Sequence, residues 1–169
     1  MNSKDYVLVF LFATVLFSLC SCIHSVESYS KPDIRIQADR VGIMPFSSNI
    51  PEVGKVVSDT IGANLLASGY TVVERTQMAK ILQDQDIGYL DVDLPDYKKI
   101  GRLTGVDVLL VGNIAFSSAT VRLVDATTGE TLIITTFQPN KITGSASAVD
   151  MGECLGKAIK KRFSKISKL

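Results

Sequence analysis

One short stretch constrains the fold of this chain more than any other, an unbroken apolar run from Val108 to Val111 that lies between two glycines. A strand with one face in water alternates apolar and polar residues, so a run without alternation is typical of a strand buried on both faces. Leu109 and Leu110 point to opposite sides of such a strand, and other parts of the chain must cover each of them. The run therefore predicts the central strand of an α/β sheet. A buried helix is the alternative, which the short length and the valines disfavour.

The N-terminal segment has the parts of a secretory signal peptide. Lys4 precedes an apolar run from Val7 to Leu19, and small residues follow that run. A transmembrane helix needs about 20 apolar residues, which is more than this run provides. We therefore expect export, with an uncleaved membrane anchor as the alternative.

The predicted signal peptide ends in a motif for lipid attachment. The sequence Leu19-Cys20-Ser21-Cys22 resembles the lipobox of bacterial lipoproteins, in which the cysteine after the cleavage site is lipidated. A leucine three residues before the cut and a serine directly before it fit Cys22, whereas Cys20 would follow a leucine. We predict a signal peptide over residues 1–21 and lipidation at Cys22, with two incidental cysteines as the alternative. Two or three acyl chains anchor a protein stably where one does not.

The mature chain divides into a tether and one domain. Residues 22–40 are polar and serine-rich, which predicts an irregular tether with a coil span of roughly 25 Å. Residues 41–169 are enough for a single domain. Apolar periodicity and turn residues predict strands at Val41–Phe46, Tyr70–Val73, Val108–Val111, Thr120–Val124 and Thr131–Thr135, with helices beginning near Pro51, Thr76, Pro95 and Met151. The predicted fold is a single α/β domain whose mixed sheet of about five strands is covered by helices on its faces.

The last predicted helix is amphipathic. Its apolar stripe includes Met151, Leu155 and Phe163, and also Cys154, which we expect to be a small buried hydrophobe. Its other side carries Lys157, Lys160, Lys161, Lys165 and Lys168. A basic side of this kind suits either contact with anionic lipid or a solvated face, and the solvated face is favoured. The net charge of only +1 argues against a nucleic-acid partner.

The sequence offers little chemistry for an enzyme. His24 is the single histidine and lies in the predicted tether, so a serine or cysteine nucleophile in the domain would have no histidine base. Clustered zinc ligands and phosphate-binding glycine loops are also missing from the sequence. A hydrolase built on Asp86, Asp91 and Asp93 is the remaining alternative. We predict no catalytic residue, no metal ligand and no cofactor.

The same aspartates lie in an acidic loop from Asp84 to Asp96, which raises the question of calcium. An EF-hand needs glycine at its sixth position and glutamate at its twelfth. Counted from Asp84, these positions hold Tyr89 and Pro95, so the loop is not an EF-hand. Another weak cation site stays open as an alternative.

Several segments, in their order along the chain, resemble the CsgG family, the curli production assembly/transport component, which has relatives such as the penicillin-binding-protein activator LpoB. The similar segments are the strand Val41–Phe46, the stretch Gly69-Tyr70-Thr71-Val72-Val73-Glu74-Arg75 continuing to Gln85, the stretch Gly101-Arg102-Leu103-Thr104-Gly105-Val106-Asp107 followed by Gly112, and the hairpin from Val121 to Glu130. The resemblance covers Val41 to about Thr135. It implies a periplasmic α/β domain on an outer-membrane lipid anchor, and Ile23 differs from the aspartate that retains many lipoproteins at the inner membrane.

The resemblance also raises the question of whether this chain forms a membrane pore. The curli secretion protein forms a ring that spans the outer membrane, and each subunit inserts two β-hairpins. This chain has no room for such hairpins at the two corresponding places, because each membrane strand needs about 9–11 residues. These places are the gap between Ile114 and Thr120 and the gap between Phe137 and the last helix. We therefore expect a non-enzymatic assembly or protein-interaction module with cell-envelope protein partners. The alternative is a homo-oligomeric ring component of a transport system without membrane strands of its own.

Overall fold

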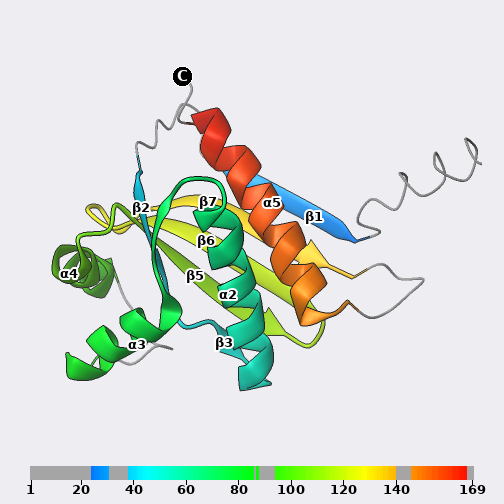
Figure 1. Ribbon diagram of the computed structural model, residues 1–169, viewed down its shortest axis with the longest axis horizontal. Coiled ribbons are helices and arrows are strands. Elements are labelled where there is room, and N and C mark those ends of the chain that lie inside the picture. The colour runs from blue at the N-terminus through cyan, green and yellow to red at the C-terminus, as the bar shows by residue number, and fades with distance from the viewer. Residues whose placement is uncertain (1–23, 31–37, 86, 88–93, 140–145, 167–169) are drawn as a thin grey trace, which may run out of the picture.

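A computed structural model of the chain describes residues 24–30, 38–85, 87, 94–139 and 146–166. The strands are β1 (Ser25–Ser30), β2 (Arg40–Ile43), β3 (Ser47–Ser48), β4 (Thr71–Val73), β5 (Val108–Ala115), β6 (Ser118–Asp125) and β7 (Thr131–Gln138). The helices are α2 (Pro51–Leu66), α3 (Arg75–Asp84), α4 (Leu94–Thr104) and α5 (Ala148–Ile166). All seven strands belong to one sheet in the order β1-β7-β6-β5-β2-β4, with β3 also paired to β5 (Figure 1).

Strand β5 joins two different halves of this sheet. On one side it pairs in parallel with β2, which pairs in parallel with β4. On the other side it pairs antiparallel with β6, followed by β7 and the edge strand β1, again antiparallel. Leu109 and Leu110 are both fully buried. The prediction of a central strand covered on both faces is therefore confirmed, and the buried-helix alternative is wrong.

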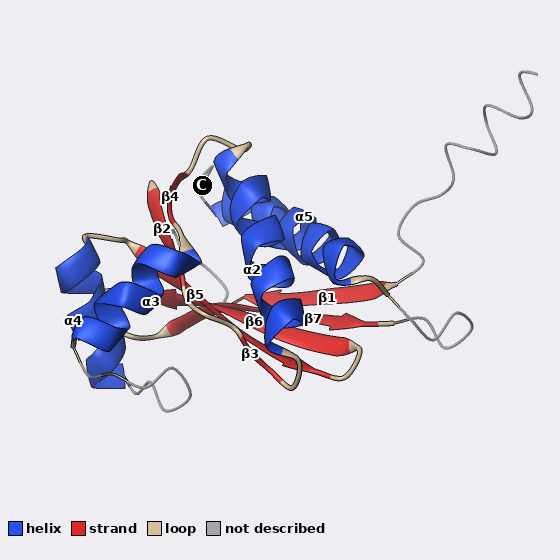
Figure 2. Ribbon diagram, turned by 60° about the horizontal axis from the view of Figure 1, so that its bottom comes forward, coloured by secondary structure: helices blue, strands red, loops and turns tan. Residues whose placement is uncertain are grey.

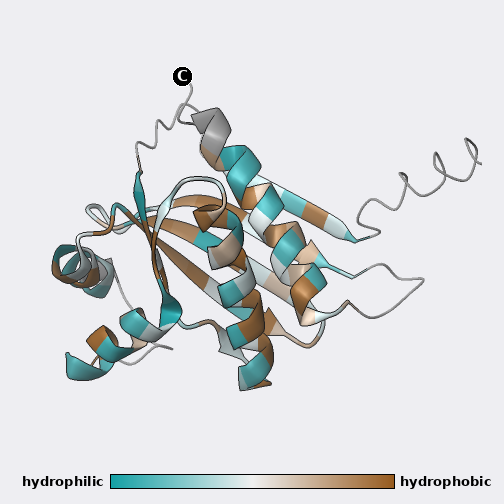
Figure 3. Ribbon diagram, in the orientation of Figure 1, coloured by the Kyte–Doolittle hydropathy of each residue, from teal (hydrophilic) through white to brown (hydrophobic). Residues whose placement is uncertain are grey.

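The two faces of the sheet are covered by different helices (Figure 2). Leu110 faces the core formed with α2 and α5, which contains Ile61, Leu155 and Phe137. Leu109 faces a second core, formed with α3 and α4. Figure 3 shows hydrophobic residues along the strands and on parts of the helices that face them. Cys154 is buried in the first core, as its place on the predicted stripe indicated.

Helices α2 and α5 touch through glycines. A Cβ atom added at Gly152 would lie 2.6 Å from Cβ of Thr60 and 3.1 Å from the carbonyl oxygen of Val57. A Cβ atom at Gly156 would lie 3.0 Å from Cβ of Asn64. These contacts place the N-terminal half of α5 beside the middle of α2, so the two helices run in the same direction.

The sheet has two strands more than the sequence predicted. Strand β1 lies inside the segment predicted as an irregular tether, so that prediction is wrong for Ser25–Ser30. Its inward side is held by polar contacts: Oγ of Ser28 lies 3.0 Å from Oγ1 of Thr135, and Nη2 of Arg162 donates to the carbonyl oxygen of Ser28 at 2.6 Å. The other added strand, β3, has only two residues and lies where a helix entry was expected.

The local predictions had mixed outcomes. Gly69 and Gly129 have positive φ values of 91° and 75°, which glycine commonly adopts at a helix end and in a hairpin loop. The helix predicted to begin near Thr76 begins one residue earlier, at Arg75, and its N-cap, Glu74, makes no side-chain capping bond. Leu103 on α4 is 50% exposed. The buried residues of α4 instead follow Tyr97, Ile100, Gly101 and Thr104, a stripe that leaves position 103 outside it.

Candidate functional site

The residues that the sequence singled out lie mostly outside the described part of the chain. Cys22 is one of them, and Asp86, Asp91 and Asp93 are the others. Among the described residues, no group of three or more His, Cys, Asp or Glu side chains is placed to hold a metal ion. No helix in the described ranges has the length and apolar character to cross a membrane. Lipidation at Cys22 and the absence of catalysis therefore stay predictions.

His24 lies at one end of the sheet, next to the start of α5. Its ring centroid is 5.2 Å from that of Phe137 on β7. Ser147 caps α5 by donating its hydroxyl to Oδ2 of Asp150 at 2.6 Å and accepting from the backbone nitrogen of Asp150 at 3.1 Å. The hydroxyl bond lowers the pKa of Asp150, and the nearby charge of His24 lowers it further. His24 thus lies against β7 and close to the start of α5.

Two neighbouring hollows lie at the carboxyl ends of the parallel strands, and Arg75 borders both. The first, of about 500 Å³, is lined by residues of α2, β4 and the start of α3, including Ile43, Leu66, Val72 and Glu74. The second, of about 480 Å³, lies beside β3 and the start of α2 and includes Phe46 and Lys55. The carboxyl ends of strands are where open α/β sheets commonly bind ligands.

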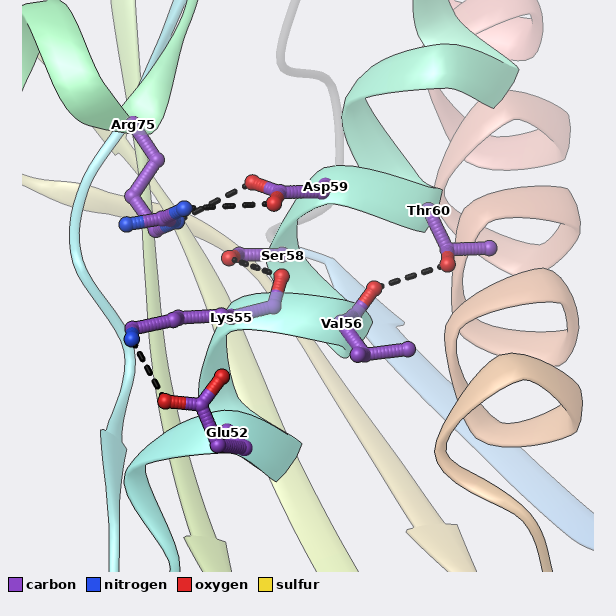
Figure 4. Close-up of polar contacts among 7 residues, drawn as sticks. All are labelled: Glu52, Lys55, Val56, Ser58, Asp59, Thr60 and Arg75. Atoms are coloured by element: carbon purple, nitrogen blue, oxygen red, sulfur yellow. Dashed lines mark hydrogen bonds and ion pairs between the residues drawn. The ribbon is translucent and has the colours of Figure 1, made fainter.

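An ion pair spans the first hollow (Figure 4). Nε and Nη2 of Arg75 donate to the two carboxylate oxygens of Asp59, at 3.0 and 3.2 Å. The Arg75 side chain is 17% exposed and that of Asp59 is 56% exposed. The hydroxyl of Ser58 donates to the carbonyl oxygen of Lys55, so it is engaged by its own helix. Paired charges beside apolar walls suit recognition of another molecule by contact. Nothing in the sequence indicated Asp59 or this hollow. Arg75 was named only as part of the stretch Gly69–Arg75 that resembles the CsgG family.

Part of the sheet is not covered by any of the described helices. Helices α3 and α4 cover the parallel half, while the same face of β6, β7 and β1 carries solvent-facing side chains. Tyr29 on β1 pairs across the strands with Ile134 on β7, which pairs with Arg122 on β6. Tyr29 is 60% exposed and Ile134 is 38% exposed. Tyr29 donates its hydroxyl to Glu27, which raises the pKa of the tyrosine. This uncovered sheet face therefore offers apolar area framed by charge.

Comparison with known protein families identifies the family of this chain. The profile of the family described as "Curli production assembly/transport component CsgG" matches residues 29–122. The chain belongs to the CsgG family. The match begins within β1 and runs into β6, so the resemblance seen in the sequence is confirmed. The search among curated proteins found no match to this CsgG-family chain.

Solved structures support the same fold for this CsgG-family member. A PelC dodecamer from Paraburkholderia phytofirmans is 13% identical, with a TM-score of 0.52 over 86% of this chain and 98% of that chain. A variant of that dodecamer is 14% identical, with a TM-score of 0.53 over 80% and 95% of the two chains. The lipoprotein GNA1162 from Neisseria meningitidis is 18% identical, with a TM-score of 0.52 over 76% and 96%. Identities this low establish the fold alone.

Proposed function

We propose that this CsgG-family chain is an exported, lipid-anchored envelope protein that works as an assembly module through protein contacts and not as an enzyme. The observation that carries the proposal is the extent of the structural match, since the chain shares its fold with nearly the whole of a PelC subunit, a protein that forms dodecamers. The likeness to the lipoprotein GNA1162 supports the anchor, together with the lipobox that ends at Cys22. The proposed location is the outer membrane, with the domain in the periplasm.

The anchor is tested by removing the lipidated thiol. Cys22→Ser should move the protein from the membrane fraction to the soluble fraction of the envelope, because no acyl chain can attach to the serine. Cys20→Ser is the matched control: it should leave the protein on the membrane, since that residue leaves with the signal peptide. Mass spectrometry of the mature N-terminus would show the acyl chains directly. A Cys22→Ser protein that stays in the membrane fraction would falsify the proposed anchor.

The uncovered sheet face supports self-association as part of this function. An exposed pair such as Tyr29 and Ile134 on a sheet face is stabilised when a second protein removes it from water. Strand β1 is also the edge strand in the sheet order, the position at which another chain can add to a sheet. We therefore place the contact between copies on β1, β7 and β6. This is the surface that a ring component of a transport system, the second candidate function, would use.

The oligomeric state of the purified mature protein tests this surface. Light scattering after size exclusion should show a defined assembly, and Ile134→Lys should shift it towards monomer because a charge would be placed inside the contact. Leu103→Lys is the control, because Leu103 is also half exposed but lies on α4. A wild-type protein that is monomeric at high concentration would refute the ring. Crosslinking in intact envelopes followed by mass spectrometry then identifies the other envelope proteins in contact.

A further inference from the structure

The structure fixes which end of the domain is nearest to the proposed anchor. Strand β1 begins at Ser25, only three residues after Cys22, and three residues span at most about 11 Å. Ser25 pairs with Gln138 at the last position of β7. With acyl chains on Cys22, this end of the sheet is therefore held within about 11 Å of the lipid-bearing residue. An irregular tether of the predicted length would have left the orientation open.

The same end of the domain presents three large apolar side chains to solvent. Phe116, at the tip of the β5–β6 hairpin, is 92% exposed. Ile50, which precedes α2, is 61% exposed, and Val149, in the first turn of α5, is 49% exposed. Pairing places the hairpin beside the end of β7, because Ala119 pairs with Phe137. Figures 1 and 2 show the hairpin, the starts of α2 and α5, and the start of β1 at one end of the molecule.

Phe116 is unusual in its backbone as well as its exposure. It has a φ of 54°, and no other described residue apart from glycine has a positive φ. Ala115 pairs with Ser118, so Phe116 is the first residue of a two-residue turn, a position where hairpins with positive φ favour glycine, asparagine or aspartate. A phenylalanine there strains the backbone and leaves its ring in water. The positive φ and the exposed ring are both unfavourable for the folded chain alone. They point to a contact between the Phe116 ring and another molecule.

We propose that this end of the domain is a membrane-contacting surface, in which Phe116, Ile50 and Val149 enter the interfacial layer of the bilayer that holds the Cys22 acyl chains. The proposal rests on the lipid anchor proposed above. An apolar surface held this close to lipid is stabilised by leaving water. Phe116 lies in the hairpin turn and is 92% exposed, so it is the residue expected to enter most deeply.

The charges at this end indicate which kind of lipid the surface fits. The first turns of α2 and α5 carry Glu52 and Asp150, so the contact does not depend on anionic headgroups. Lys160 and Lys161 lie in the second half of α5, which runs towards the opposite end of the molecule (Figure 1). Contact through the predicted basic side of α5 would therefore orient the domain in the reverse sense. Neutral phosphatidylcholine vesicles suffice for the surface proposed here.

A tryptophan at the hairpin tip tests the contact, because the chain has no tryptophan of its own. The full lipidated protein with Phe116→Trp is placed in phosphatidylcholine vesicles whose acyl chains carry bromine, a contact quencher. Leu66→Trp is the matched control: Leu66 is 61% exposed and lies at the far end of α2. Ser117→Trp, at the other turn position, is a second reporter in case the first variant does not fold.

The proposal expects emission from the Phe116→Trp variant to shift to shorter wavelength and to lose intensity in the brominated vesicles, while emission from the Leu66→Trp variant changes in neither respect. A blue shift without quenching would mean that a second copy of the chain covers the tip, which overturns the proposal. Quenching of the Leu66→Trp variant in place of the tip variant would show the reverse orientation and also overturns it. Protein that does not remain with the vesicles when Cys22 is intact refutes the anchor itself, and the inference with it.

Discussion

Substitution of one glycine between α2 and α5 sets two physical effects against each other. In the interior of a helix, alanine is favoured over glycine by about 1 kcal/mol, so Gly152→Ala should stabilise the protein if propensity decides. Sterics oppose this, because the new Cβ would lie 2.6 Å from Cβ of Thr60. That atom is fixed to the backbone and cannot rotate away, so the helices must move apart. Overpacking of this kind costs about 1–3 kcal/mol.

We expect the steric cost to exceed the propensity gain, with a net loss of up to about 2 kcal/mol in the free energy of unfolding. Gly62→Ala is the matched control, because its Cβ would meet only Ile43 and Val72, at 3.7 and 3.8 Å. That variant should gain about 1 kcal/mol. Urea unfolding followed by circular dichroism measures both changes. If Gly152→Ala proves as stabilising as Gly62→Ala, the close approach of the two helices is wrong.

Two further predictions concern the core and the cap of α5. Leu109→Ala and Leu110→Ala should each lower the free energy of unfolding by about 2–5 kcal/mol, since both side chains are fully buried in different cores, and the same urea titration measures them. If either substitution left the free energy of unfolding unchanged, the strand would not be buried on both faces. Ser147→Ala should cost about 1 kcal/mol at neutral pH through the lost cap. Because the pKa of Asp150 is lowered in the folded state, the stabilisation from its bond to Ser147 is present above the ordinary value of 3.8 and is lost as the pH falls below it. The cost of Ser147→Ala should therefore shrink in acid, and a cost that grows in acid would contradict the assigned bond.

The sequence predicted those parts of the fold that apolar patterning determines. The central strand, the hairpin and the stripe of α5 all depend on buried apolar side chains at regular spacing, and all three are present. Strand β1 could not be found in this way, because Ser28 faces inward and its partners are Thr135 and Arg162. Its alternation is masked by serine on both sides. Polar contacts between distant segments leave no periodic trace in a single sequence.

The candidate surfaces were harder to predict than the fold. The ion pair of Asp59 with Arg75 joins two helices across a hollow, and neither residue belongs to a spacing pattern with chemical meaning. In the sequence, Phe116 follows Ile114 and Ala115, and nothing distinguishes it from the apolar residues of the buried strand. Only the turn geometry shows that its ring projects into solvent.

The pairing of β1 with β7 sets the order in which the chain can be completed. Ser28 and Thr135 are 107 residues apart, so the first strand of the domain has no partner until almost all of the polypeptide has been delivered. Exported chains emerge from the translocon N-terminus first, and β5, β6 and β7 can form their hairpins locally as they arrive. Strand β1 would then be the last strand to join the sheet. If Cys22 carries acyl chains as proposed, the strand next to the lipid is also the one that completes the sheet.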